Sequence, residues 1–300
     1  MLLGQHLRRL AVKSAEQIVS VLSGVERVDS NVFRSMHPLP ENMQNAALYG
    51  GQLVSQAMMA CMQTVSDWLQ MHSVQCSFLK RASPGQSVLY FIERDRDGRT
   101  FSTRSVKALQ DGQCILLACL SFHKETHCVV EHQAKMPKVP LPESLDASRE
   151  SPEEHFSLLG TMSQYFQQKP IKMDKQALDS YGSPLELLWL KATSAISDDL
   201  RMNQCLASHI THNLMFHMAM KPFKDSSNDM SSAIATDHCD WFHYSQLNFS
   251  EWVLSERSLN YASGSSGFSH CRLWSKDGQL LVSGMQETTL EDQVKKTLSK

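Results

Sequence analysis

The sequence predicts a duplicated α+β fold in which each half of the chain combines one helix with an antiparallel sheet. The first observation is a hairpin turn that occurs once in each half, and the second is the order of helix-prone and strand-prone stretches before it. The third is length, since 300 residues exceed the about 100–200 residues of an ordinary domain. With 42% apolar residues, each half can bury a core of its own.

The hairpin turn is the clearest part of the repeat. Asp111-Gly112-Gln113 and Asp277-Gly278-Gln279 each separate two apolar, β-prone runs. An Asp-Gly pair between such runs predicts a tight hairpin, because its backbone tolerates the positive φ of a type I′ turn. The flanking strands are predicted at Phe101–Leu109, Cys114–Phe122, Gly267–Ser275 and Leu280–Glu287.

A helix and a strand precede each hairpin. In the first half, Ala, Met, Gln and Leu at helical spacing predict a helix over Gln52–Val65, and alternation predicts a strand over Ser73–Lys80. In the second half a helix over Cys205–Met220 is stopped with the help of Pro222. The strands predicted around that helix are Leu185–Ala192, Ser232–His243 and Glu251–Asn260.

A proline-dense segment divides the two halves. Met136 to Pro142 contains three prolines in seven residues, which is typical of an extended connector, and polar residues continue it. The predicted organisation is an N-terminal extension at 1–30, a first unit at 31–131, a linker at 132–182, a second unit at 183–292 and a tail at 293–300.

Composition excludes several functional classes. Lys and Arg are scattered and the net charge is -2, so no basic stripe for nucleic acid is expected. No apolar run approaches the about 20 residues of a membrane-spanning helix, and the amphipathic start, Met1–Leu22, favours a surface helix over a transit peptide. The 8 cysteines form no C-x-x-C pair and lie mostly in apolar stretches, which indicates reduced thiols and an intracellular protein.

Motifs for other chemistries are missing from the sequence. Gly264-Ser265-Ser266-Gly267 does not match a G-x-S-x-G nucleophile elbow, and neither dinucleotide nor P-loop glycine motifs occur. A zinc site at His209, His212 and His217 would require converging ligands at suitable spacing, so ordinary helix histidines are favoured. We therefore expect no metal and no cofactor.

Several blocks, in order along the chain, resemble the acyl-CoA thioesterase II family. Tyr49-Gly50-Gly51-Gln52 is similar to the stretch that opens the first helix of that family. Further matching blocks are His72–Phe78, Glu93-Arg94, Phe101–Val106, Asp237-His238, Arg272–Trp274 and Met285–Glu287. The resemblance covers about Asn31 to Asp292 and implies a double hotdog, an α+β fold of two fused units in which an antiparallel sheet wraps a long helix.

The resemblance also implies a reaction, the hydrolysis of fatty acyl-CoA thioesters to free fatty acid and CoA without a metal or cofactor. The family uses an Asp, a Thr or Ser, and a Gln to hold a water beside the thioester carbonyl. The carboxylate accepts the proton of the water while the hydroxyl and amide orient it. N–H groups at a helix N-terminus stabilise the oxyanion.

Only one of these three groups is present unchanged in this chain. By resemblance Gln286 is the family's Gln, and the repeat places it opposite Leu120 of the first half. His212 occupies the position of the Asp, and an imidazole with a pKa near ~6.5 can accept a proton from water. Ala235 occupies the position of the hydroxyl, and the adjacent Thr236 would reach the site only through a bulge or register shift. The predicted catalytic residues are thus Gln286, His212 and Thr236.

The predicted substrate contacts come from two blocks. Gly50, Gly51 and Gln52 open the first helix, where glycine would let a ligand carbonyl approach the helix N–H groups or would simply form a turn. Asp237 and His238 belong to the strand beside the site.

Because two of the three catalytic positions differ from the family, a second hypothesis stays open. The chain could be a paralogue that binds acyl-CoA without hydrolysing it. Under either hypothesis the expected partners are acyl-CoA and further copies of the chain. The resemblance implies a peroxisomal location, but Leu298-Ser299-Lys300 is not an intact Ser-Lys-Leu signal, and the alternative is the cytoplasm.

Overall fold

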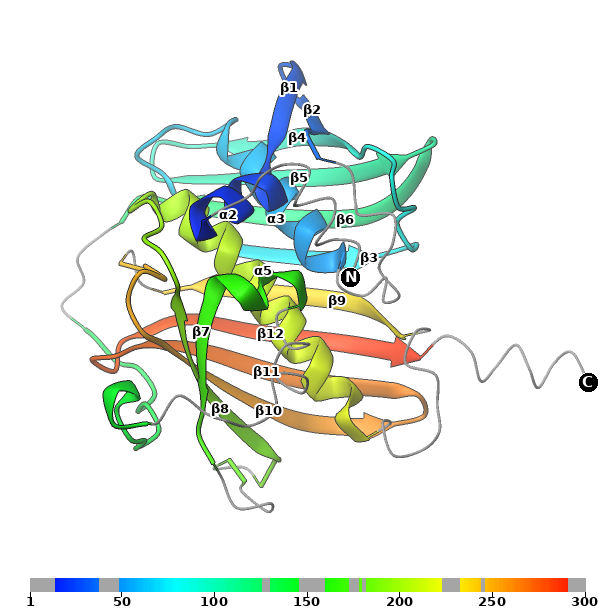
Figure 1. Cartoon of the computed structure of the whole chain (residues 1–300). Helices are drawn as coiled ribbons and strands as arrows, with labels where there is room; N and C mark the ends of the chain where they lie inside the picture. Colours follow the sequence, from blue (N-terminus) through cyan, green and yellow to red (C-terminus); the bar gives the residue numbers. More distant parts are fainter. Residues whose placement is uncertain are drawn as a thin grey trace, which may run out of the picture.

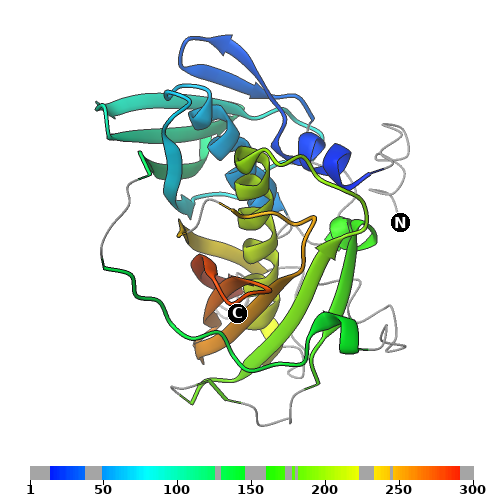
Figure 2. The same cartoon turned by 90° about the vertical axis from the view of Figure 1, so that its left-hand side faces the viewer.

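The computed structural model describes residues 14–37, 49–125, 130–145, 160–172, 178–179, 182–222, 233–243 and 246–290. In this part of the chain, a 12-stranded antiparallel sheet curves around two helices, α3 and α5 (Figures 1 and 2). The first half supplies α2 (Ala15–Ser23), β1 (Val25–Asp29), β2 (Val32–Ser35), α3 (Tyr49–Met62), β3 (Gln70–Phe78), β4 (Leu89–Asp97), β5 (Phe101–Gln110) and β6 (Gln113–His123). The second half supplies β7 (Phe166–Pro170), β8 (Leu185–Ala192), α5 (Leu200–Met220), β9 (Ala233–Phe242), β10 (Val253–Ser263), β11 (Ser266–Ser275) and β12 (Leu280–Leu290).

The strand order shows the duplication directly. The sheet runs β1-β2-β4-β5-β6-β3-β9-β12-β11-β10-β8-β7, so the two halves repeat the same order outward from the central β3–β9 pair. In that pair Val74 lies opposite Asp240 and Cys76 lies opposite His238. The sheet includes β1 and β7 and therefore extends beyond the predicted starts of the two units.

The two Asp-Gly hairpins differ in detail. In the first, Asp111 and Gly112 have φ values of 46° and 72°, as the predicted type I′ turn requires. In the second only Gly278 has a positive φ, and its N–H donates to Ser275 O, so the predicted type I′ turn is wrong there. A register shift between Leu273 and Trp274 accompanies this longer loop.

Both predicted helices are present with shifted ends. The helix α3 begins at Tyr49, three residues before the predicted start, and ends at Met62. The helix α5 begins at Leu200, where the Asp199 carboxylate accepts a hydrogen bond from Arg201 N and so caps a free helix N–H. The described part of the predicted N-terminal helix is α2, which turns an apolar face to the core.

The helices α3 and α5 pack against each other in opposite directions. Gly50 near the start of α3 lies against His212, while the Ser55 hydroxyl further along donates to Cys205 O at 2.9 Å. Met58 and Met62 are buried in the same core. The cysteines that the structure describes are free thiols. No described helix is long and apolar enough to span a bilayer.

Candidate active site

Three of the predicted side chains meet where α5 crosses β9 and β12. Gln286 on β12 and His238 on β9 are cross-strand partners with buried side chains. The ring of His212, on α5, has its centroid 5.4 Å from that of His238. Both histidines are 0% exposed and Gln286 is 1% exposed. These residues form one cluster although they come from three separate segments of the sequence.

Hydrogen bonds run through this cluster from β12 to β9. Gln286 Oε1 lies 3.0 Å from His238 Nδ1, and Gln286 Nε2 donates to Thr288 Oγ1 at 3.2 Å. On the other side of the ring, His238 Nε2 lies 2.9 Å from Asp240 Oδ2. The amide of Gln286 is therefore held at both ends, by an imidazole and by a hydroxyl.

Asp240 is a member of the cluster that the sequence reasoning missed. Its Oδ2 also accepts hydrogen bonds from Ser208 Oγ at 2.6 Å and Thr211 Oγ1 at 3.0 Å, both on α5. The carboxylate is 0% exposed. Strand alternation could have found it, because Asp240 lies two positions after His238 and shares its face of β9.

Two glycines of α3 make room for two histidines of α5. A Cβ on Gly50 would lie 2.5 Å from His212 Nε2, and a Cβ on Gly51 would lie 2.9 Å from His209 Nδ1. Both glycines belong to α3, so the alternative that they form a turn before the helix is wrong. Gln52 is buried in the same helical turn. The absence of a Cβ thus lets the two helices approach at the site.

Burial also changes the chemistry of His209. Removal from water lowers its pKa from 6.5 to about 4, with the neighbouring Gly51 backbone acting in the opposite direction. At neutral pH this imidazole is uncharged, so it contributes packing and no positive charge beside His212.

Thr236 and Asp237, the two strand residues before His238, have partners other than Gln286. A register shift places Glu287 opposite Asp237 and Thr288 opposite Ala235, which leaves Thr236 in a bulge. The Thr236 hydroxyl donates to Glu287 O at 3.3 Å, so the bulge does not bring it to Gln286. The structure places the Thr288 hydroxyl on Gln286 instead. Asp237 is exposed and accepts a hydrogen bond from the Ser77 hydroxyl at 2.6 Å.

The cluster has the groups for acid–base chemistry on a water molecule. It combines two imidazoles, a buried carboxylate and an amide, all within one layer between α5 and the sheet. Across the described segments, no group of three or more His, Cys, Asp or Glu side chains is arranged to hold a metal ion.

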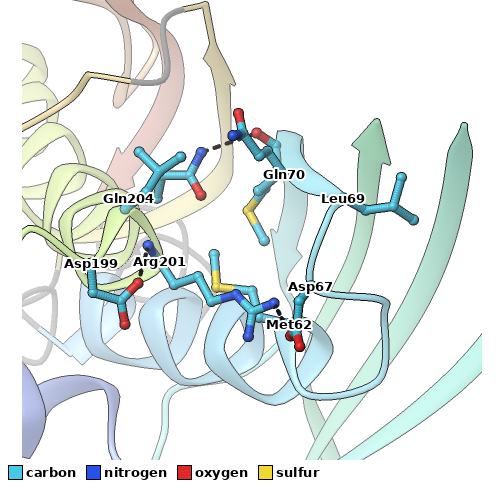
Figure 3. A pocket seen from close by; sticks show the side chains of 9 residues that line it. Met62, Asp67, Leu69, Gln70, Asp199, Arg201 and Gln204 are labelled. Atoms are coloured by element: carbon cyan, nitrogen blue, oxygen red, sulfur yellow. Dashed lines mark hydrogen bonds and ion pairs between the residues drawn. The ribbon is translucent and has the colours of Figure 1, made fainter. Parts of the chain in front are cut away.

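A pocket of about 190 Å³ lies at the other end of the α3–α5 pair (Figure 3). Its wall includes Met62 at the end of α3, Leu200 at the start of α5 and Gln204, whose amide donates to the Met71 carbonyl at 3.1 Å. Arg201 reaches across it to Asp67, with 2.9 Å between Nη2 and Oδ1. Gly50 lies at the far end of α3 from Met62, and His212 lies about three turns along α5 from Leu200, so this pocket is separate from the Gln286 cluster.

Two family models match this chain, one in each half. The model of the acyl-CoA thioesterase N-terminal domain matches residues 37–123, and the acyl-CoA thioesterase model matches residues 162–289. Acyl-coenzyme A thioesterase 8 of Rattus norvegicus is 32% identical over 297 residues, covering 94% of this chain and 91% of that protein. The chain belongs to the acyl-CoA thioesterase II family. Acyl-CoA thioesterase 2 of Haemophilus influenzae is 27% identical and covers 88% of this chain and 93% of its own length.

Solved structures of thioesterase II proteins have the same fold. The enzyme TesB2 of Mycobacterium marinum superposes with a TM-score of 0.77 at 21% identity, covering 91% of this chain and 98% of that one. The tesB protein of Mycobacterium avium subs paratuberculosis gives a TM-score of 0.74 at 23% identity, with 92% and 100% covered. The α+β double hotdog expected from the sequence is confirmed.

Proposed function

We propose that this chain hydrolyses fatty acyl-CoA thioesters to free fatty acid and CoA. Family membership supports the reaction class. The observation that carries the proposal at the site is the Gln286 amide, held by His238 and Thr288 and lying in the same buried cluster as His212. These hydrogen bonds offset the cost of burying the polar groups and hold the amide in one orientation beside the imidazoles.

The proposed mechanism uses water as the nucleophile. Gln286 holds the water through its amide, and His212 accepts the proton as the water attacks the thioester carbonyl. The first turn of α3, at Gly50 and Gly51, offers backbone N–H groups to the developing oxyanion. His212 then returns the proton to the CoA thiolate as the C–S bond breaks. In this mechanism the hydroxyl that contacts Gln286 is that of Thr288, because the Thr236 hydroxyl is hydrogen-bonded to Glu287.

Complete burial of the cluster affects how substrate reaches it. His212 and His238 have no exposed surface, so water and the thioester enter only when the packing around α3 and α5 opens. The low dielectric of the closed site then strengthens the electrostatic contacts with the oxyanion.

The test is the release of CoA thiol from purified protein, measured over a series of acyl-CoA chain lengths, beside the thermal shift that each ligand produces. Turnover with the wild-type chain supports hydrolysis. Stabilisation by acyl-CoA without any turnover supports the alternative, a paralogue that only binds the thioester. Neither turnover nor stabilisation would contradict both hypotheses.

Two finer expectations rest on the same family resemblance. A peroxisomal location is supported by the similarity to acyl-coenzyme A thioesterase 8, and microscopy of the full chain in cells tests it. Leu298, Ser299 and Lys300 lie outside the described part of the chain. Association of the chain with further copies of itself is tested by sedimentation.

A further inference from the structure

We propose that Asp240 is a positioning residue for hydrolysis, which acts through His238 to fix the orientation of the Gln286 amide. This inference rests on the proposed function and adds a residue to its machinery. Asp240 does not touch the amide itself, because the imidazole of His238 lies between them.

The hydrogen-bond geometry determines which atoms of His238 carry protons. Asp240 Oδ2 lies 2.9 Å from Nε2, and because a carboxylate only accepts, Nε2 must donate. Gln286 Oε1 lies 3.0 Å from Nδ1, and because an amide oxygen only accepts, Nδ1 must also donate. The ring of His238 is then an imidazolium, and Asp240 neutralises its charge inside the core.

This arrangement leaves one defined group free on Gln286. Its oxygen is bonded to the imidazolium, and one of its two amide hydrogens is bonded to the Thr288 hydroxyl. The second amide hydrogen is the remaining contact for a water or a thioester oxygen. If His238 lost the proton on Nδ1, this nitrogen would accept a hydrogen bond instead of donating one. The Gln286 amide would then flip so that its NH2 group faces Nδ1. The charge on Asp240 therefore selects the productive amide orientation.

The surroundings of Asp240 are shaped around its carboxylate. Ser208 and Thr211 both direct hydroxyls at Oδ2 from the turn of α5 that precedes His212. A Cβ on Gly284 would lie 2.5 Å from Oδ1, so this strand position has room only for glycine. The imidazole of the site therefore comes from α5, at His212, and its carboxylate comes from β9, at Asp240.

The variant Asp240→Asn tests the proposal, since it keeps the shape of the side chain and removes its charge. We expect kcat to fall about 100-fold, while KM changes by less than about threefold. A loss of this size is close to that seen when one hydrogen-bond donor to the transition state is removed. The matched control is Gln204→Leu, which removes another buried hydrogen bond of α5, from Gln204 Nε2 to Met71 O, near the start of that helix and away from the Gln286 cluster. Its melting temperature falls while its kcat stays at the wild-type value.

A double-mutant cycle separates positioning from a general packing effect. If Asp240 acts through Gln286, then Asp240→Asn lowers kcat far less in a Gln286→Ala background than in the wild type. Equal losses in the two backgrounds would overturn the proposal. A kcat for Asp240→Asn equal to that of the control variant would also overturn the proposal.

Nitrogen NMR of the histidine rings supplies a readout that needs no turnover. Both ring nitrogens of His238, assigned by comparison with His238→Gln, are expected to be protonated in the wild type at pH 7. A neutral ring in the wild type would overturn the proposal even if Asp240→Asn fails to fold. If the wild-type protein shows no turnover, the proposed function is contradicted. If the wild type is active and Asp240→Asn is equally active, only the role of Asp240 is contradicted.

Discussion

The ring of His212 lies against the backbone of Gly50, and its Nε2 is only 2.5 Å from the position that a Cβ on residue 50 would occupy. The helix α3 therefore comes close enough to α5 for its first N–H groups to face the same cluster as the imidazole. Any side chain at position 50 must displace the ring that we propose as the proton acceptor.

Gly50→Ala is expected to lower the free energy of unfolding by about 1–3 kcal/mol, as overpacking of a filled core does, and to reduce turnover by displacing His212. Urea unfolding and CoA release measure the two effects. The matched background is His212→Ala, which removes the ring and leaves room for the new methyl group. Gly50→Ala should cost little stability there, and an equal cost in both backgrounds would show that the ring is not what the methyl group meets.

The two threonines on either side of the register shift allow a matched comparison. Thr288→Val removes the hydroxyl that accepts from Gln286 Nε2, and we expect kcat to fall about tenfold, the equivalent of one hydrogen bond of about 1.4 kcal/mol. Thr236→Val removes a hydroxyl bonded to Glu287 and should change kcat by less than about twofold. A larger loss at Thr236 than at Thr288 would restore the role predicted for Thr236 from the sequence.

His209 predicts a specific pH dependence of stability. Its pKa in the folded protein is about 4 because burial disfavours the charged ring, against 6.5 when exposed. Between these values the unfolded chain binds a proton that the folded chain does not, so the free energy of unfolding falls as the pH drops below 6.5. This residue alone should account for a loss of about 2 kcal/mol between pH 7.5 and pH 5.

The variant His209→Gln should be correspondingly less sensitive to this change in pH. The control is His132→Gln at an exposed position, which should keep the wild-type dependence. Urea unfolding followed by tryptophan fluorescence at the two pH values gives all three curves. The same slope for His209→Gln as for the wild type would mean that His209 is already protonated in the folded chain.

The repeated architecture could be predicted because it depends on local signals. Asp111-Gly112 forms its type I′ turn from its own backbone preferences, and both helices follow their apolar spacing. The start of α5 was predicted five residues late because the cap at Asp199 lies in a polar segment without apolar periodicity. No strand was predicted at β1, β2, β4 or β7. The strands β1, β2 and β7 are short and lie at or beside the edges of a sheet that the sequence does not display, and the second half of β4 is a run of charged residues.

The site was predicted in part, and the rest depended on contacts between distant segments. Resemblance placed Gln286, His212 and His238, and all three lie in the cluster. Asp240 shares the buried face of β9 with His238, but its role depends on Ser208 and Thr211, which lie on a different element. The orientation of Thr236 depended on where the bulge falls, which is a property of the pairing of β9 with β12.

The comparison that tests the account most directly is CoA release by the wild type and by Gln286→Leu. Leucine is the residue that the first half carries at the equivalent position, Leu120, so the substitution places a side chain that this fold already accommodates. We predict turnover in the wild type and a loss of kcat of about 10²–10³-fold in the variant, with the melting transition retained. Wild-type turnover that survives Gln286→Leu unchanged would contradict the assignment of the active site to this cluster.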